Sequence, residues 1–291
     1  MKIEEGYMPF KGYQTYYRIV GEKSDRAPLL LLHGGPGSTH NYMEVLDCLA
    51  DERQVISYDQ LGCGNSYLDG HPELWKLETW LDELKSLISY LKLDRVHLLG
   101  QSWGGMLLIA YLLEAGQKGV CSATLSSTLP ASWLWGREQH RLIRFLSEED
   151  QKAIYQAEQS GDFTSEAYKL ADQHFMERHC SSKPTENDPE CLHREKKSGR
   201  EAYVTAWGPD EYTPIGTLKD FDYIDQLNQI KVPTLICSGI NDMCTPLIAK
   251  LMHDKIPDSS WHLFDHSRHM CYVEQHDEYC KILREFLNNN E

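Results

Sequence analysis

The chain has 291 residues, of which 41% are hydrophobic and 25% charged, a composition typical of a globular protein with a sizeable core. Its formal charge of −15, from 29 basic and 44 acidic residues, argues against nucleic acid or an anionic membrane as a partner. No segment reaches the roughly 20 apolar residues of a membrane span, and no apolar signal region follows the N-terminus. Nine cysteines without regular spacing predict reduced thiols and a cytoplasmic location.

The order of the expected elements predicts an α/β fold. Residues 6–21 alternate aromatic and polar side chains, as in an opening β-hairpin. Apolar strands then alternate with helical patterns, which is typical of a mostly parallel sheet covered on both faces. The expected strands are 29–33, 55–59, 96–100, 124–127, 233–239 and 261–264, and the expected helices include 79–91 and 106–114.

The alternation stops after Pro130. Residues 131–220 are charged, aromatic and mainly helical in pattern, which predicts a helical cap inserted into the sheet domain. The core is then expected to comprise residues 1–130 and 221–291. A cap in this place would close over the carboxyl ends of the strands and limit the size of the substrate.

A glycine-rich loop, His33-Gly-Gly-Pro-Gly37, follows the first buried strand. Loops of this kind place a backbone N–H over a nucleophile, and glycine lets the backbone approach an oxyanion closely. Gly34 or Gly35 is expected to supply this donor, with Gly34 preferred. His33 is interpreted as a structural residue of the loop.

The segment Gly100-Gln-Ser102-Trp-Gly104 has the Gly-x-Ser-x-Gly frame of a nucleophile elbow. It lies between an expected strand and an expected helix, which is the context that this motif requires. Ser102 is therefore the candidate nucleophile, and the amide of Trp103 is the second expected oxyanion donor. A glycine-rich turn with a solvated serine is the alternative that the pattern alone leaves open.

Two later strands each end in a candidate partner for Ser102. Asp242 follows the strand 233–239 and is expected to orient an imidazole, although an Asp in this position can also cap the next helix. His266 and His269 follow the last strand, and His269 is preferred because it lies further beyond that strand. The order Ser102, Asp242, His269 is the serine–acid–histidine order of α/β-hydrolases.

Four motifs together closely resemble the proline iminopeptidases, which are prolyl aminopeptidases of the α/β-hydrolase fold. They are His33-Gly-Gly-Pro-Gly37, Asp59-Gln-Leu-Gly-Cys-Gly-Asn-Ser66, Gly100-Gln-Ser-Trp-Gly-Gly105 and Trp207-Gly-Pro-Asp-Glu-Tyr212. The resemblance covers essentially the whole chain. It implies hydrolysis of an N-terminal proline, or another small residue, from short peptides, amides or arylamides.

The resemblance also implies an anchor for the substrate's free ammonium, which needs a carboxylate partner once it is buried. Glu211 occupies this position, with Asp210 and Glu201 as further candidates in the cap. Some relatives carry a second glutamate directly after the triad aspartate, where this chain has Met243. The residues expected to line the substrate site with Glu211 are Gly35, Tyr203 and Trp207, and Trp133, Trp135 and Tyr212 are further aromatic candidates.

Other functions use similar features. An amino-acid amidase would use the same machinery with ammonia as the leaving group, and a non-catalytic receptor would keep the pocket without turnover. The pairs His179-Cys180 and Cys191-Leu-His193 do not match a common zinc spacing. No metal and no cofactor are therefore expected.

Overall fold

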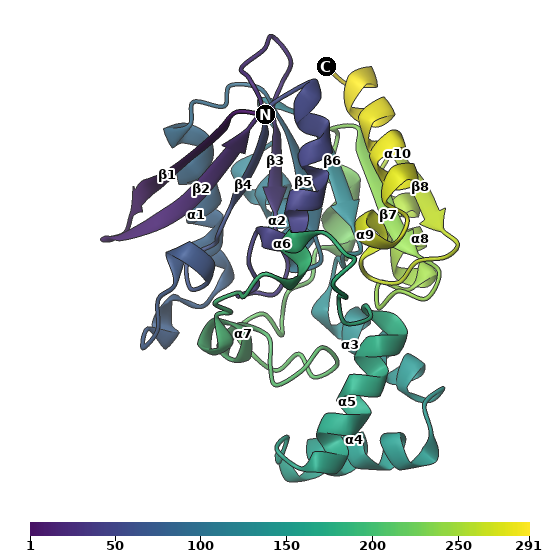
Figure 1. Ribbon diagram of the computed structural model, residues 1–291. Helices are drawn as coiled ribbons and strands as arrows, with labels where there is room; N and C mark the ends of the chain where they lie inside the picture. The colour runs from purple at the N-terminus through teal and green to yellow at the C-terminus, as the bar shows by residue number, and fades with distance from the viewer.

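A computed structural model of the protein describes all 291 residues, and a single eight-stranded β-sheet forms its centre (Figure 1). The strands are β1 (Ile3–Phe10), β2 (Tyr13–Val20), β3 (Leu29–Leu32), β4 (Val55–Tyr58), β5 (Val96–Gln101), β6 (Val120–Ser126), β7 (Thr234–Gly239) and β8 (Ser259–Phe264). Their order across the sheet is β1-β2-β4-β3-β5-β6-β7-β8.

The strand directions bring the ends of β3, β5, β7 and β8 to one edge of the sheet. β1 and β2 form the expected hairpin, which turns at Lys11 and Gly12, and β2 runs antiparallel to β4. From β4 to β8 all pairings are parallel. The loops that follow the carboxyl ends of parallel strands meet at this edge, where open α/β sheets bind ligands.

The helices of the sheet domain lie on both faces of the sheet. The 3₁₀ helix η1 (Asn41–Asp51) and the helices α9 (Cys271–Glu274) and α10 (His276–Asn289) cover one face. The other face is covered by α1 (Leu77–Tyr90), α2 (Trp103–Ala110), its π-helical extension η4 (Tyr111–Ala115) and α8 (Pro246–Lys255). Short 3₁₀ turns η2 (Gly64–Ser66), η3 (Pro72–Leu74) and η5 (Ile224–Gln229) lie in the connecting loops.

The strand residues alternate between the two layers of core, as a period of two requires. Along β3, Leu30 and Leu32 pack in the larger cluster with α1, α2 and α8, whereas Leu29 and Leu31 pack in the smaller cluster with η1 and α10. All four side chains are buried. The continuous apolar run that predicted a buried strand therefore serves two cores.

The segment between β6 and β7 contains five α-helices besides η5, namely α3 (Ser132–Ile143), α4 (Glu148–Ser160), α5 (Glu166–His179), α6 (Glu190–His193) and α7 (Arg200–Ala206). An antiparallel bridge joins Ala131 to Asp222 where the chain leaves and re-enters the sheet domain. We propose that residues 131–220 act as the cap. In Figure 1, α4 and α5 form its outer end, far from the sheet.

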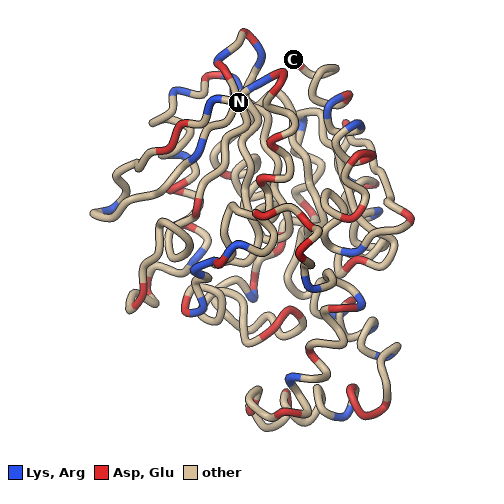
Figure 2. Tube along the Cα trace, viewed as in Figure 1, with Lys and Arg blue, Asp and Glu red and all other residues tan.

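The acidic residues are distributed over both the sheet domain and the cap (Figure 2). The net charge is thus a general property of the chain and does not come from a single acidic region. None of the helices combines the length and the apolar character that crossing a bilayer would require.

Candidate active site

Ser102 lies at the sharp turn between β5 and α2. Its backbone has φ 55° and ψ −122°, a conformation that L-residues rarely adopt, and its N–H donates to the Ser126 carbonyl at 3.0 Å. The turn lifts the serine out of the sheet and places it at the N-terminus of α2, where the helix dipole favours negative charge. This geometry is that of a nucleophile elbow.

The elbow depends on close backbone contact on the α2 side. A Cβ atom added to Gly104 would collide with the carbonyl oxygens of Leu32 and His33, so α2 approaches β3 more closely than any side chain allows. Glycine in the frame is thus required by packing as well as by the turn.

We expect Gly104→Ala to lower the free energy of unfolding by about 1–3 kcal/mol, because rigid backbone atoms occupy the space of the added methyl group. Denaturant titration would measure this change. Gly136→Ala is the matched control, since its Cβ would first meet the Pro214 ring at 3.3 Å, and we expect a change within about 1 kcal/mol. Equal stability of the two variants would contradict the proposed tight packing.

Of the two candidate histidines, His269 is the one paired with Asp242. Its Nδ1 lies 2.7 Å from Asp242 Oδ1, and both side chains are buried. The carboxylate is held in turn by the backbone N–H of Cys244 at 2.7 Å and that of Gly239 at 3.3 Å. His266 has a side chain 84% exposed and pairs only with its neighbour Asp265. The preference for His269 over His266 thus agrees with the geometry.

The charge environment of His269 favours its protonated form. Burial acts to lower its pKa, but the Asp242 carboxylate, assisted by Glu211 and Glu274, outweighs burial, so that the pKa is raised above its usual value. This arrangement stabilises the imidazolium that forms when the ring accepts a proton from serine.

Ser102 and His269 line one cavity of about 390 Å³ at the carboxyl edge of the sheet, although no hydrogen bond joins them here. Glu211, Tyr203 and Gly35, expected in the substrate site, line the same cavity. The wall also contains residues that the sequence motifs do not single out, namely Ser38, Tyr42, Ser181, Ser198, Arg200 and Met270.

The preferred oxyanion donor, Gly34, is directed elsewhere in the structure. Its N–H donates to the hydroxyl oxygen of Tyr42 at 2.6 Å, and the Tyr42 hydroxyl donates to Gln101 Oε1 at 2.9 Å. The amide of Gly35 makes no hydrogen bond, and Gly35 lines the cavity beside Ser102. This geometry favours Gly35 over Gly34 as the candidate donor, and the φ of 118° at Gly35 is a conformation that favours glycine. No sequence motif points to Tyr42, because its role depends on the tertiary contact of its hydroxyl with the Gly34 amide.

His33 supports this loop and is not free to act as a base. Its Nε2 accepts the N–H of Gln60 at 3.0 Å, and its Nδ1 lies 2.8 Å from the Gly34 carbonyl. Burial lowers its pKa to about 4, so the ring is neutral. Gln60 also accepts the indole N–H of Trp103 at 2.7 Å, which links the glycine loop to the elbow.

Glu211 is the cap carboxylate at the cavity wall. Its Oε1 accepts the hydroxyl of Tyr203 at 2.8 Å, and its backbone carbonyl accepts the indole N–H of Trp135 at 2.8 Å. Burial raises its pKa, while the charge of His269 and the Tyr203 hydrogen bond oppose this shift. A cation bound in the cavity would further favour the ionised form.

The other acidic candidates are structural acceptors, Asp210 within the cap and Glu201 between the cap and residues 70–75 of the sheet domain. Asp210 accepts the Tyr168 hydroxyl at 2.6 Å and two backbone N–H groups. Glu201 accepts the N–H groups of Gly70, His71 and the Trp75 indole. Neither Asp210 nor Glu201 lines the cavity. Met243, which directly follows Asp242 in the sequence, does line it but carries no charge. Glu211 is consequently the one carboxylate of this group that lines the cavity.

The aromatic candidates divide into two groups. Trp135 and Trp207 line a narrow recess beside Ser102, together with Gly35, Trp103, Met106, Leu129 and Glu211. Trp133 is 50% exposed and donates to Asp222, and Tyr212 packs edge-on against Phe175 inside the cap. Trp133 and Tyr212 are therefore not part of the recess.

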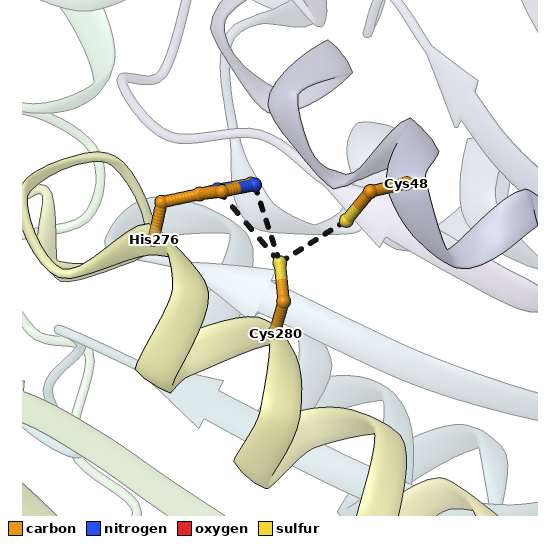
Figure 3. Close-up of side chains that lie close together, drawn as sticks. All are labelled: Cys48, His276 and Cys280. Carbon is orange, nitrogen blue, oxygen red and sulfur yellow. Dashed lines mark hydrogen bonds between the residues drawn. The ribbon is translucent and has the colours of Figure 1, made fainter.

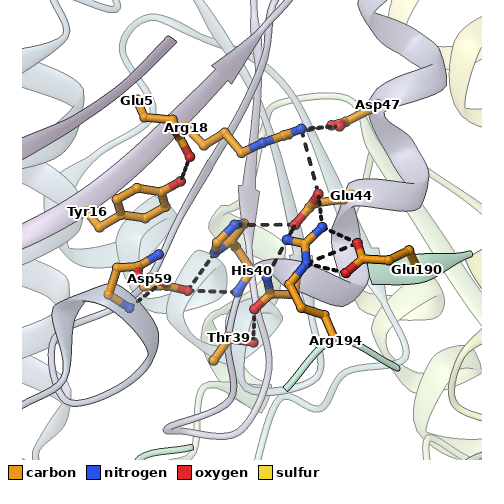
Figure 4. Close-up of polar contacts among 12 residues, drawn as sticks. Glu5, Tyr16, Arg18, Thr39, His40, Glu44, Asp47, Asp59, Glu190 and Arg194 are labelled. Carbon is orange, nitrogen blue, oxygen red and sulfur yellow. Dashed lines mark hydrogen bonds and ion pairs between the residues drawn. The ribbon is translucent and has the colours of Figure 1, made fainter. Parts of the chain in front are cut away.

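A polar network fastens the cap to the sheet domain (Figure 4). Arg194 of the cap pairs with Glu44 of η1 at 2.7 Å and with Glu190 at 2.5 Å. Glu44 also lies 3.5 Å from His40, whose Nδ1 is 2.8 Å from Asp59. Glu44, His40 and Asp59 are largely buried, so their contacts are less screened than surface ion pairs. Arg194 and Glu190 are exposed, and their pair is screened by solvent.

The segment that follows Arg194 forms one wall of the cavity. The carbonyl of Lys197 accepts the N–H of Gly64, and the N–H of Gly199 donates to the Gly37 carbonyl, each at 2.8 Å. Ser198 therefore lies between two backbone contacts with the sheet domain, where it lines the cavity. The network positions this wall relative to the glycine loop.

Two clusters contain residue types that bind metals. One consists of His33, Asp59 and Cys63, and the other of Cys48, His276 and Cys280. None of these six residues lines the cavity. The chemistry that the site supports is accordingly nucleophilic, with a serine, an imidazole–carboxylate pair and backbone donors.

Comparison with known proteins gives a consistent result. The model of the α/β-hydrolase fold family matches residues 27–275. The chain is 55% identical to a proline iminopeptidase of Clostridioides difficile over 293 residues and to one of Lactobacillus acidophilus over 294 residues, with full coverage of each. Among solved structures, it is similar to a Mycobacterium smegmatis proline iminopeptidase, with 32% identity and a TM-score of 0.87 over 99% of this chain and 98% of that one. VinJ has 30% identity and a TM-score of 0.90, with 99% of each chain covered.

Proposed function

The chain belongs to the proline iminopeptidases of the α/β-hydrolase fold, and we propose that it releases N-terminal proline from short peptides by acyl transfer through Ser102. His269 takes the proton of the serine hydroxyl as Ser102 attacks the carbonyl carbon of the N-terminal residue. The C–N bond then breaks, and His269 gives the proton to the departing amine. Water attacks the acyl-enzyme with the same imidazole as base.

The proposed oxyanion hole consists of the amides of Gly35 and Trp103. The Trp103 amide lies at the first position of α2, where the helix itself provides no acceptor. The support for Gly35 is its unpaired amide beside Ser102. Two preorganised donors of this kind stabilise the negative charge of the tetrahedral intermediate more than that of the substrate carbonyl.

Glu211 is the proposed anchor of the substrate's ammonium, and its placement carries the assignment as an aminopeptidase. A cation offsets the desolvation of an ionised carboxylate in a partly buried wall, and the free N-terminus of a peptide provides one. Glu211 also borders the aromatic recess beside Ser102. A residue that occupies this recess would hold its amino group near Glu211 and its carbonyl near the serine.

The recess between Trp135 and Trp207 is the proposed proline slot. Its other apolar walls are Trp103, Met106 and Leu129, which are buried. Apolar and aromatic walls favour a compact ring such as pyrrolidine over a charged side chain. The recess has only about 10 Å³ of free volume, so its walls would move apart to admit a compact ring and further still for a larger side chain.

Glu211→Gln is expected to lower kcat/KM for proline 4-nitroanilide by about 100-fold or more, since the buried cation would lose its charged partner. Gln keeps an acceptor for the Tyr203 hydroxyl, so the cap should be unchanged. Steady-state kinetics with the free and the N-acetylated anilide measure this effect. Wild type should cleave the free-amine compound far better than the acetylated one, and the variant should lose that preference.

Glu166→Gln is the matched control, because Glu166 is an exposed cap glutamate with a side chain 91% exposed. It should keep wild-type kinetics. Equal cleavage of the two anilides by wild-type enzyme would contradict the role of Glu211 and favour a general amidase or esterase.

The cytoplasmic location and the absence of a nucleic-acid partner remain part of the proposal. All nine cysteines are free thiols, as expected in a reducing compartment, and the charge of −15 opposes binding to polyanions.

A further inference from the structure

Three reactive side chains meet outside the cavity, at the contact between η1 and α10 (Figure 3). Cys48 lies on η1, while His276 and Cys280 lie one turn apart on α10. The two sulfur atoms are 3.1 Å apart, although the cysteines are separated by 232 positions in sequence. Cys48 is partly exposed and Cys280 is buried, so the pair is reached from solvent on the Cys48 side.

The position of the imidazole argues against a metal ion shared by His276 and Cys280. His276 Nδ1 lies 3.0 Å from the Tyr272 carbonyl, the partner to which it donates, and Cys280 Sγ lies 3.7 Å from Nδ1 and 3.6 Å from Nε2. These nearly equal distances mean that neither nitrogen lone pair is directed at the sulfur. In Figure 3 the ring is seen edge-on with the sulfur to one side of its plane. A metal-bound histidine instead directs one ring nitrogen at the ion.

The surroundings distinguish the two thiols. Cys48 has its pKa lowered to about 7 by the hydrogen bond with Cys280, against the effect of burial, and the charges of His276 and Arg284 act in the same direction. The same contact and burial raise the pKa of Cys280. Because Cys48 is the partner exposed to solvent, it is the thiol that a dissolved oxidant reaches first, and Cys280 lies behind it in position to react next.

We propose that Cys48 and Cys280 form a redox-active dithiol, which a hydroperoxide converts into a reversible disulfide between η1 and α10. The Cys48 thiolate attacks one peroxide oxygen, the O–O bond breaks, and Cys48 becomes a sulfenic acid as water leaves. The Cys280 sulfur then attacks Cys48 Sγ, the S–S bond forms, and the S–O bond breaks to release a second water. Two thiols and one hydrogen peroxide thereby give one disulfide and two waters, and an added dithiol reverses the reaction by thiol–disulfide exchange.

The separation of the sulfurs suits this step. A disulfide needs an S–S distance of about 2.05 Å, so the atoms must approach by only about 1 Å. The bond would close a very long loop and constrain the unfolded chain strongly. It would join the helix that carries Tyr42 to the helix that follows the His269 loop. Neither cysteine lines the cavity, so the cross-link should stabilise the protein without altering turnover.

The test treats the reduced full-length enzyme with one to a few equivalents of hydrogen peroxide and maps its thiols by differential alkylation and mass spectrometry. We expect a mass loss of about 2 Da, a cross-linked peptide pair containing Cys48 and Cys280, and reversal by dithiothreitol. The melting temperature of the oxidised form should rise by roughly 5–10 °C. kcat for proline anilide should stay within about twofold.

Variants assign the roles of the two thiols. Cys48→Ser and Cys280→Ala should each abolish both the cross-link and the thermal shift, and Cys280→Ala should move the pH profile of Cys48 alkylation to higher pH. Cys121→Ser is the matched control, since Cys121 is a partly exposed cysteine with no neighbouring thiol, and it should oxidise like wild type.

Several results would overturn the proposal. They are oxidation of Cys48 to the sulfinic acid without a cross-link, a disulfide elsewhere, or zinc or copper bound stoichiometrically by the isolated protein and lost in Cys48→Ser. The mapping of oxidised thiols on the wild-type protein tests the proposal even if a variant fails to fold. Because it does not depend on the substrate, its outcome is separate from that of the proposed function.

Discussion

Replacing Ser102 by alanine is expected to lower kcat for proline 4-nitroanilide by about 10⁴- to 10⁶-fold while leaving the fold intact. The proposed acyl-enzyme requires the serine oxygen, and no other nucleophile in the cavity can form it with the same partners. Residual activity would come from the oxyanion donors and substrate binding alone. In rapid-quench experiments, any burst of acyl-enzyme formation seen with the wild type should be absent from the Ser102→Ala variant.

Ser127→Ala is a closely matched control for this experiment. Ser127 is also a buried serine with positive φ, 49° against 55° for Ser102, but it does not line the cavity. Both substitutions remove one hydroxyl from a strained backbone position, so their effects on stability should be similar. If Ser127→Ala lost activity to the same extent, structural damage would explain the result and the role of Ser102 would be unsupported.

The sequence predicts the sheet and the order of the site segments well, because both depend on local patterns. The apolar run of β3 is continuous because each face of the strand packs against its own hydrophobic core. The elbow motif is recognisable because close backbone contacts require glycine at positions 100 and 104. The expected strand 124–127 is too short, because β6 begins at Val120 with two less apolar positions that the pattern discounts. A helical pattern is expected between the strands 29–33 and 55–59, but no bounds are predicted for it, and the structure shows the 3₁₀ helix η1 there.

The features of the site that the sequence leaves open have a common physical origin. Gly34 and Gly35 are equivalent in the sequence, and only the contact of the Tyr42 hydroxyl with the Gly34 amide distinguishes them. Likewise, the spacing of Trp133 and Trp135 does not reveal which indole faces the serine. Cys48 and Cys280 come together through the packing of η1 on α10, for which no motif exists. Long-range contacts of this kind need coordinates.

The Asp242→Asn variant is expected to lower kcat by about 10⁴-fold, the second of the two largest effects. Asparagine keeps the size of the side chain, but it removes the charge that stabilises protonated His269 and can present its amide group to Nδ1. The imidazole would then lose both its orientation and the support for its charged form.

The same substitution makes a signed prediction for pH dependence. The base must be neutral to accept the serine proton, so activity falls as pH drops through the pKa of His269. In wild type this pKa is raised, which places the acid limb of kcat above the usual histidine value of about 6.5. The Asp242 carboxylate is the main influence that raises the pKa of His269. Without it, the effect of burial lowers this pKa, so the acid limb of kcat should move to lower pH.

Asp242 can act by orienting the His269 ring or by stabilising its charge, and the pH profile distinguishes these two roles more clearly than the loss of activity does. A purely structural role for Asp242 would lower kcat without moving the acid limb, whereas the electrostatic role requires the limb to move toward acid. Glu211 also raises the pKa of His269, so the limb of Glu211→Gln should shift in the same direction while its nucleophile, base and oxyanion donors remain in place. An acid limb that stays fixed in both variants would mean that a group other than His269 controls the reaction.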